Sequence, residues 1–113
     1  MADKSGLGHW RVLRMTAVVL VPLVLWLAYG LTSLAGADYA AHRAWAGVPL
    51  NGILLAGFLV VMFRHAQLGT EEVIEDYVHA PCIKHAALIA VRVAAFGLLA
   101  IGLVAVAVLV FGG

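Results

Sequence analysis

Three long apolar runs dominate the chain, over residues 15–35, 44–63 and 93–111. None of them contains a charged residue. Each has close to the roughly 20 residues that a helix needs to cross the roughly 30 Å hydrocarbon core of a bilayer. Because backbone groups in lipid must be hydrogen-bonded within their own segment, each run is predicted to be a helix. The pattern therefore predicts an all-α membrane protein with three transmembrane helices, organised as a single domain over residues 1–113.

Proline positions agree with this interpretation. Pro49 lies near the start of the second run, where a missing N–H matters little. Pro22 lies one to two turns into the first run, where we expect a mild kink. Pro81 follows the second run and disfavours helix in the residue before it, so a helix that continues beyond the run must end before Pro81.

The first run could instead be a cleaved signal peptide, because Ala35-Gly36-Ala37 has the small-x-small form of a cleavage site. The apolar part of a signal peptide has about 7–15 residues, however, and this run is longer. We therefore interpret it as a retained span. No amphipathic segment rich in Arg and Ser precedes it, which favours a bacterial inner membrane.

Composition supports the membrane class and excludes others. The chain is 65% hydrophobic and 12% charged, whereas soluble domains are about one quarter charged. The net charge is +1 and no basic tract is interleaved with aromatic residues, which argues against nucleic-acid binding. Cys82 is the single cysteine, so an internal disulfide and a Cys-x-x-Cys metal site are both excluded.

Positive charge is distributed unevenly between the two sides of the predicted membrane. Only one basic residue, Arg43, lies in the loop between the first and second runs. The others lie before the first run or between the second and third: Lys4, Arg11, Arg14, Arg64, Lys84 and Arg92. The positive-inside rule therefore predicts a cytoplasmic N-terminus, a cytoplasmic second loop and an outside C-terminus.

The three polar segments outside the apolar runs lead to different predictions. Residues 1–9 are polar and rich in glycine, and we expect them to be poorly ordered. Residues 36–43 form a short outer loop. Residues 64–92 are longer, and two arrangements are open. Either the second helix continues and aligns His65, Gly69, Glu72 and Asp76 on one face, or Gly69 interrupts it and the next residue caps a new helix.

His65 is the first candidate for chemistry, two residues beyond the second apolar run. It is either an interfacial histidine with its polar tip in water or an axial ligand to haem iron through a neutral imidazole. A six-coordinate haem needs a second ligand. His9 is the nearest candidate, but it lies in the N-terminal region that we expect to be soft. A second ligand would therefore come from a partner protein.

The adjacent Asp76 and Tyr77 form the second candidate. Tyr77 is either an interfacial anchor or a hydrogen-bond donor to a quinone oxygen, and Asp76 could orient a basic partner or relay protons. Arg14 could pair with a haem propionate or a phosphate, since arginine binds carboxylates in a bidentate way. It could equally extend to the membrane surface, as could Arg92. Glu71, Glu72 and Glu75 suggest a metal cluster only by their number, and we expect a solvated acidic face or a docking face for a soluble partner.

Small residues indicate where helices approach one another. Gly52 and Ala56 lie four residues apart in the second span and allow close helix contact, and Gly97 and Gly102 do so less regularly in the third. Three short spans bury little against each other, so we expect a partner within the membrane.

The run His65-x-x-x-Gly69 followed by Asp76-Tyr77 resembles the signature of the small hydrophobic membrane anchor, the D subunit, of succinate dehydrogenase (respiratory complex II). The opening His9-Trp10, then Arg14-x-Thr16, fits as well, as do the three spans and the inward N-terminus. The resemblance covers most of the chain, and its central run is the more specific part.

The resemblance implies a role for each matching residue. His65 would ligate haem b, with the second ligand from the C subunit. Tyr77 would hydrogen-bond the ubiquinone carbonyl, with Asp76 beside it, in a pocket shared with the C subunit and the iron–sulfur protein. Arg14, and less firmly His9, would lie near the haem propionates.

The function that this resemblance implies is that of a membrane anchor subunit of succinate:ubiquinone oxidoreductase. Succinate would be oxidised on a flavoprotein partner, because nothing in this chain resembles a flavin or iron–sulfur motif. One alternative is the anchor of a fumarate reductase that uses menaquinone. Another is a small membrane protein without redox work, such as an assembly factor or a transporter protomer.

Overall fold

The computed structural model describes residues 2–112, with side-chain surroundings from residue 8 onward. Four helices follow one another: α1 (Ala2–Ser33), α2 (Tyr39–Gly47), α3 (Pro49–Tyr77) and α4 (Pro81–Phe111). Three stretches are long and apolar enough to cross a membrane, namely Gly8–Ser33, Pro49–Tyr77 and Pro81–Phe111. The predicted all-α architecture with three spans is confirmed.

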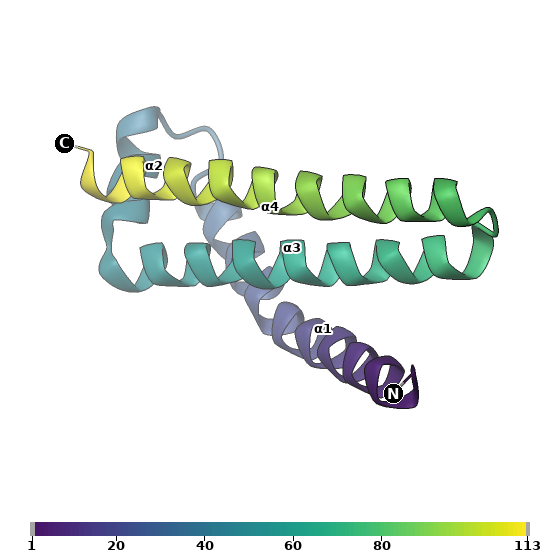
Figure 1. The fold of residues 1–113 in the computed structure, drawn as a ribbon. Helices are drawn as coiled ribbons and strands as arrows, with labels where there is room; N and C mark the ends of the chain where they lie inside the picture. Colours follow the sequence, from purple (N-terminus) through teal and green to yellow (C-terminus); the bar gives the residue numbers. More distant parts are fainter. Residues whose placement is uncertain (1, 113) are drawn as a thin grey trace.

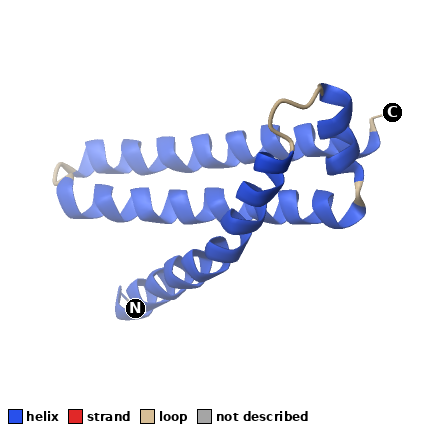
Figure 2. Ribbon diagram, turned by 180° about the vertical axis from the view of Figure 1, so that it is seen from behind, coloured by secondary structure: helices blue, strands red, loops and turns tan. Residues whose placement is uncertain are grey.

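The helix α3 is the centre of the arrangement. It runs antiparallel to α4 along almost its whole length, and α1 crosses it at an angle (Figure 1). Within residues 2–112, the backbones of α1 and α4 do not come close to each other. The start of α1 and the α3–α4 turn lie toward one end, while α2 and the end of α4 lie at the other (Figures 1 and 2). This alternation agrees with the predicted loop order, and the compartment at each end stays a prediction.

Each long helix extends beyond the apolar run that predicted it. The helix α1 begins at Ala2, well before the apolar run that starts at residue 15. The expectation of poor order over residues 1–9 stays a prediction, and residue 1 lies outside the described residues. The helix α4 begins at Pro81 rather than at residue 93, with the proline in the first turn, where its missing N–H has no partner to lose. The apolar runs are therefore expected to mark the lipid-buried part of each helix, and the polar extensions are expected to reach the headgroup region.

Gly69 does not interrupt α3. The helix runs unbroken over 29 residues, so the first of the two arrangements is correct. It ends at Tyr77, before Pro81 as predicted, and the Val78 N–H closes the last turn on the Ile74 carbonyl at 2.9 Å. At 1.5 Å per residue α3 is about 43 Å long, which exceeds the hydrocarbon core by roughly 13 Å. Its last turns therefore lie outside the lipid core.

The helix α2 was missed by the sequence pattern. Gly36 turns the chain with φ of 79°, and Asp38 then caps α2 by accepting a hydrogen bond from the Ala41 N–H at 3.0 Å. The predicted span 44–63 is wrong at its start, because residues 44–47 belong to α2. The break falls at Val48, whose backbone is extended as expected of a residue before proline.

Aromatic packing joins α1 to α2. The indole of Trp45 stacks on that of Trp26 with ring centroids 5.4 Å apart. Gly30 is buried beneath the same ring, and a Cβ there would lie 2.6 Å from Cζ2 of Trp45. The helix α2 therefore packs on α1 through the Trp45 ring, which leaves no room for a side chain at Gly30.

Small residues also bring α3 and α4 together. A Cβ on Gly52 would lie 2.9 Å from Val110, and one on Gly102 would lie 3.1 Å from Leu59. The predicted close contact at Gly52 is confirmed, and Gly102 makes one too. Gly97 has nothing within 4 Å of its Cβ position, so it makes no such contact in this chain.

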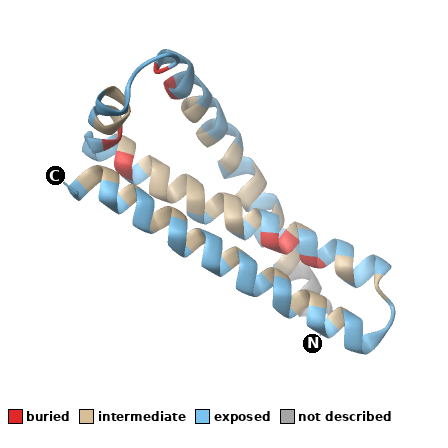
Figure 3. Cartoon of the chain, turned by 90° about the horizontal axis from the view of Figure 1, so that it is seen from above, coloured by how far each residue is buried: buried red, intermediate tan, exposed pale blue. Residues whose placement is uncertain are grey.

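The protein buries few side chains by itself. Within residues 8–112, the buried apolar side chains are those of Leu34, Ala46 and Leu68, and most of each helix surface is exposed or half-buried (Figure 3). Exposed apolar faces of this extent are normal where lipid or another membrane helix replaces water. The shape therefore agrees with the expectation of a partner within the membrane.

The Trp45 contact gives a testable prediction. We expect Gly30→Ala to lower the midpoint of thermal unfolding of the purified protein in detergent. Overpacking costs about 1–3 kcal/mol, more than the roughly 1 kcal/mol that alanine gains in a helix. Gly97→Ala is the matched control, because it makes the same change in open space and should leave the midpoint unchanged or slightly higher. Equal midpoints for the two variants would contradict the packing of Trp45 on Gly30.

Candidate functional site

His65 lies at the crossing of α1 and α3. Its Nδ1 is 2.9 Å from the hydroxyl oxygen of Thr16 on α1. The same hydroxyl reaches the carbonyl oxygens of Val12 at 2.8 Å and Leu13 at 2.9 Å. The hydroxyl has one proton, and carbonyl oxygens can only accept. The pattern therefore favours a hydroxyl that donates within its own helix and accepts the Nδ1–H of His65.

This tautomer matters for what His65 can bind. A neutral imidazole with its proton on Nδ1 carries a free lone pair on Nε2. Metal-bound histidines characteristically use the second ring N–H to bond an oxygen acceptor in this way. The residues described hold no group of three or more His, Cys, Asp or Glu side chains that could hold a metal ion. His65 can therefore supply one ligand to a metal whose other ligands come from elsewhere.

His9 lies at the same crossing but is oriented differently. Its Nε2 is 3.0 Å from the carbonyl oxygen of Leu68 on α3. Because that oxygen can only accept, His9 donates through Nε2 and has Nδ1 left for another partner. His9 and Thr16 are seven residues apart, about two helical turns, so both project from one face of α1. Two hydrogen bonds thus fix α1 against the part of α3 that carries His65.

Arg14 is not placed beside His65. Arg14 and Thr16 are separated by just over half a helical turn, so Arg14 projects from the far side of α1. Its guanidinium carbon lies 5.5 Å from the centroid of the Trp10 ring, within the range of a cation–π contact. The side chain is exposed and available to an anion outside the chain.

Asp76 and Tyr77 are the last two residues of α3 and are both exposed, Tyr77 to 76%. They follow His65 by about three helical turns, or roughly 16 Å along the axis. His65 and the Asp76–Tyr77 pair therefore lie at two depths on one helix and do not form a single cluster. A pocket around the pair would need walls from another chain.

A buried polar cluster lies between these two depths. Glu71 is 7% exposed, and its carboxylate accepts a hydrogen bond from the Gln67 Nε2 at 2.8 Å. Arg92 on α4 donates to the same carboxylate through Nε at 3.3 Å and Nη2 at 3.4 Å. This Glu71 cluster (Gln67, Glu71 and Arg92) ties α3 to α4 at the polar end.

The cluster corrects one sequence prediction. Glu71 is not part of a solvated acidic face, whereas Glu72 and Glu75 are exposed as expected. Two features of the sequence set Glu71 apart from Glu72 and Glu75. Gln67 lies four residues earlier on the same face of the helix, and a basic residue lies at the edge of the third apolar run. Counting carboxylates alone could not separate Glu71 from its neighbours.

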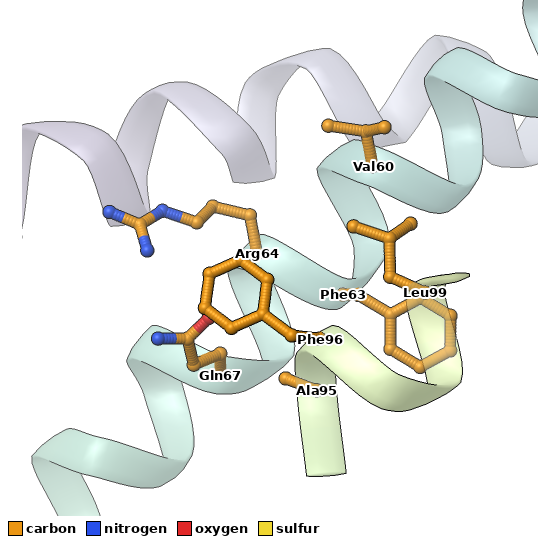
Figure 4. Close-up of a pocket in the computed structure, with 7 residues that line it drawn as sticks. All are labelled: Val60, Phe63, Arg64, Gln67, Ala95, Phe96 and Leu99. Carbon is orange, nitrogen blue, oxygen red and sulfur yellow. The ribbon is translucent and has the colours of Figure 1, made fainter. Parts of the chain in front are cut away.

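A groove of about 380 Å³ opens between α3 and α4 next to this cluster (Figure 4). Apolar side chains form most of its wall, and Arg64 and Gln67 stand at its polar rim. Its lining comprises Val60, Phe63, Arg64 and Gln67 from α3, and Ala95, Phe96 and Leu99 from α4. His65 does not line this groove, so the groove and the α1–α3 crossing are distinct features of the same helix.

Comparison with known proteins identifies relatives over most of the chain. A family model described as succinate dehydrogenase/fumarate reductase transmembrane subunit matches residues 1–111. A succinate dehydrogenase hydrophobic membrane anchor subunit of Rickettsia bellii is 35% identical over 89 residues, which cover 79% of this chain and 71% of the relative. The subunit of the same name from Rickettsia conorii is 31% identical over 90 residues, with the same coverage.

A more distant relative has a similar name. The succinate dehydrogenase membrane anchor subunit of Reclinomonas americana is 29% identical over 100 residues, covering 81% of this chain and 79% of the relative. No solved structure matches the chain significantly.

The Glu71 cluster predicts a stability effect. We expect Arg92→Met to lower the thermal midpoint, because it leaves the carboxylate of Glu71 buried without its cation. The full cost of breaking a buried ion pair is about 3–5 kcal/mol, and we expect about 1–3 kcal/mol because Arg92 is half exposed. Adding Glu71→Gln should restore part of the loss, since a neutral amide is less costly to bury.

The control for this prediction is a second ion pair on the same two helices. Lys84 and Glu75 approach to 3.8 Å, and the Glu75 side chain is 54% exposed whereas that of Glu71 is 9% exposed. We expect Lys84→Met to change the unfolding free energy by less than about 1 kcal/mol. If Lys84→Met and Arg92→Met lower the midpoint equally, burial of Glu71 is not the cause.

Proposed function

The chain belongs to the family of succinate dehydrogenase and fumarate reductase transmembrane subunits, and on that premise we propose that it anchors a succinate:ubiquinone oxidoreductase and helps to form its quinone-reduction site. It is a multi-pass protein of the bacterial inner membrane. The observation that carries the proposal is the family match over residues 1–111, because its relatives are named for this anchor role.

The proposed complex divides the work among subunits. Succinate is oxidised on a flavoprotein partner, and electrons pass through an iron–sulfur partner toward the membrane. A C subunit packs against this chain within the bilayer. The exposed apolar faces of α1 and α4 support such a partner, since this chain leaves them uncovered. The positive-inside rule predicts a cytoplasmic α3–α4 turn, which would be accessible to soluble partners.

His65 is proposed as one axial ligand of haem b. The imidazole of His65 suits this role, because an Nδ1–H bonded to Thr16 leaves Nε2 free to bind the iron. Haem brings its own four nitrogen ligands, which suits a site that offers a lone histidine, and the C subunit would supply the second axial ligand. When bound, haem supplies a one-electron redox centre.

Arg14 and His9 are proposed to lie near the haem propionates. The planar fork of Arg14 suits a carboxylate, and its exposure leaves it free to donate. His9 already gives its Nε2 proton to Leu68, so it can meet a propionate only through a protonated Nδ1. The permanent charge of Arg14 therefore favours it as an anion partner, whereas His9 is the residue on the face of α1 that meets α3.

Tyr77 and Asp76 are proposed as this chain's contribution to the ubiquinone site. The Tyr77 hydroxyl donates a hydrogen bond to a quinone carbonyl oxygen, which becomes more basic as electrons arrive. Reduction of the quinone to the quinol takes two electrons and two protons, and the protons come from water at this exposed end of α3. Asp76 orients a basic partner group or passes protons. Support comes from their exposure at the end of a helix that rises out of the lipid core.

The succinate dehydrogenase anchor role has two alternatives. A fumarate reductase anchor with menaquinone belongs to the same family, but the relatives described above are named for succinate dehydrogenase. A membrane protein without redox work predicts no haem and no effect of quinone-site variants. Family membership favours the redox role.

The haem assignment predicts the outcome of one substitution. In the purified complex, we expect His65→Ala to abolish the b-type band in the reduced-minus-oxidised visible spectrum, because α3 has no other histidine to replace the lost ligand. His79→Ala is the control, since His79 is an exposed histidine just beyond the end of α3. A haem band that survives His65→Ala unchanged would rule out this ligand.

The quinone assignment predicts a split between two activities. We expect Tyr77→Phe to lower quinone reduction by the complex about fivefold, the value of one lost hydrogen bond of about 1 kcal/mol, while succinate oxidation with an artificial dye persists. Tyr39→Phe is the control, because it removes an exposed phenol at the opposite end of the protein. Equal loss of both activities, or loss of neither, would count against the quinone role.

A further inference from the structure

Thr16 has no role in the function proposed above, yet it is the residue that touches the second ring nitrogen of His65. We propose that Thr16 is a positioning residue: its hydroxyl holds His65 in the Nδ1–H tautomer and fixes the ring plane, so that Nε2 is presented as the haem ligand. This inference rests on the proposed haem ligation and deepens it.

The Thr16 hydroxyl has too few protons to donate to every neighbour. Thr16 has one hydroxyl proton, and the carbonyl oxygens of Val12 and Leu13 both lie within 2.9 Å of its oxygen. With that proton directed into its own helix, the oxygen can interact with Nδ1 only as an acceptor. The alternative tautomer, with its proton on Nε2, would block the atom that has to bind iron.

The Thr16 hydroxyl is held rigidly. A β-branched side chain has few rotamers in a helix, and the bonds to the helix carbonyls restrict the hydroxyl further. The acceptor for Nδ1–H is thus fixed relative to α1, and α1 is fixed relative to α3 by the nearby bond from His9 to Leu68. Rotation of the His65 ring would break the bond to Thr16 in a setting that is partly shielded from water.

The Thr16 oxygen that accepts the His65 Nδ1–H is a neutral group. Many metal-bound histidines donate to a carboxylate, which pulls the imidazole toward imidazolate and raises its basicity. A threonine oxygen carries no charge, so it selects the tautomer while leaving His65 a neutral ligand. The hydroxyl is therefore expected to influence the bound haem's electronic signature as well as its retention.

A purely structural role is the competing explanation, since the same hydrogen bond joins α1 to α3. The two explanations differ in a measurable way. If Thr16 only joins helices, its loss lowers assembly or stability and leaves the ligand field of any haem that remains unchanged. If Thr16 positions His65, the haem that remains has an altered ferric electron paramagnetic resonance signal, because the ring plane and hydrogen bond have changed.

The experiment uses the intact purified complex with three variants. Thr16→Val keeps the shape and β-branching and removes the hydroxyl, and Thr16→Ser keeps the hydroxyl. Thr32→Val is the matched control, because Thr32 lies on the same helix and donates only to its own helix, to Tyr29 at 2.8 Å. Haem per complex and the low-spin ferric resonance signal are measured for each.

We expect Thr16→Val to retain haem about 10- to 100-fold more weakly and to shift the resonance signal, as is typical when a partner of a metal-bound histidine is lost. Thr16→Ser should restore retention, and Thr32→Val should match the wild type. A Thr16→Val complex with wild-type retention, or with weaker retention and an unchanged signal, overturns the inference. If Thr16→Val fails to assemble, Thr16→Cys provides a weaker acceptor, and its signal must differ from that of the wild type.

Failure of the inference is distinguishable from failure of the proposed function. A b-type band that persists in His65→Ala rejects haem ligation by His65, and the role of Thr16 falls with it. Loss of the band in His65→Ala, together with an unaltered Thr16→Val complex, rejects only the positioning role.

Discussion

The structure depends on satisfying polar side chains where water is scarce. Every buried side-chain nitrogen or oxygen in the described residues has a hydrogen-bond partner. At the polar end, the partners of α3 are supplied by both neighbours: α1 reaches it through Thr16 and His9, and α4 reaches it through Arg92. With so little apolar burial, these bonds and a few glycine contacts determine how the helices meet.

One consequence is that the two proposed sites lie at two depths on α3. His65 lies at the α1–α3 crossing, close to the edge of the apolar run, and Tyr77 lies about three turns beyond it. The drier position of His65 suits a redox centre. The water-exposed position of Tyr77 suits a reaction that takes up protons. The unbroken helix keeps the two in a fixed relation, which two helices separated at Gly69 would not do.

The sequence predicted those features that depend on local rules. Apolar length predicted the spans, and Pro81 predicted where α3 had to end. The helix α2 was missed because its nine residues are too few for a strong periodic pattern and its last residues continue the apolar run into α3. Glu71 was misjudged because its burial depends on Arg92, 21 positions away, and the role of Gly30 depends on a ring from α2. Such contacts follow from tertiary packing, which local patterns do not contain.

The chain prepares its half of each site to a different extent. In the proposed haem site, Thr16 sets the tautomer and ring plane of His65, so the partner adds the opposite ligand. At Tyr77, the exposed phenol has no wall around it, and the partner must form most of the pocket. A hydrogen bond from Tyr77 to quinone oxygen also serves reduction and oxidation alike, since the same donor is used in both directions. The proposed hydrogen bond from Tyr77 therefore does not by itself favour either direction of electron flow.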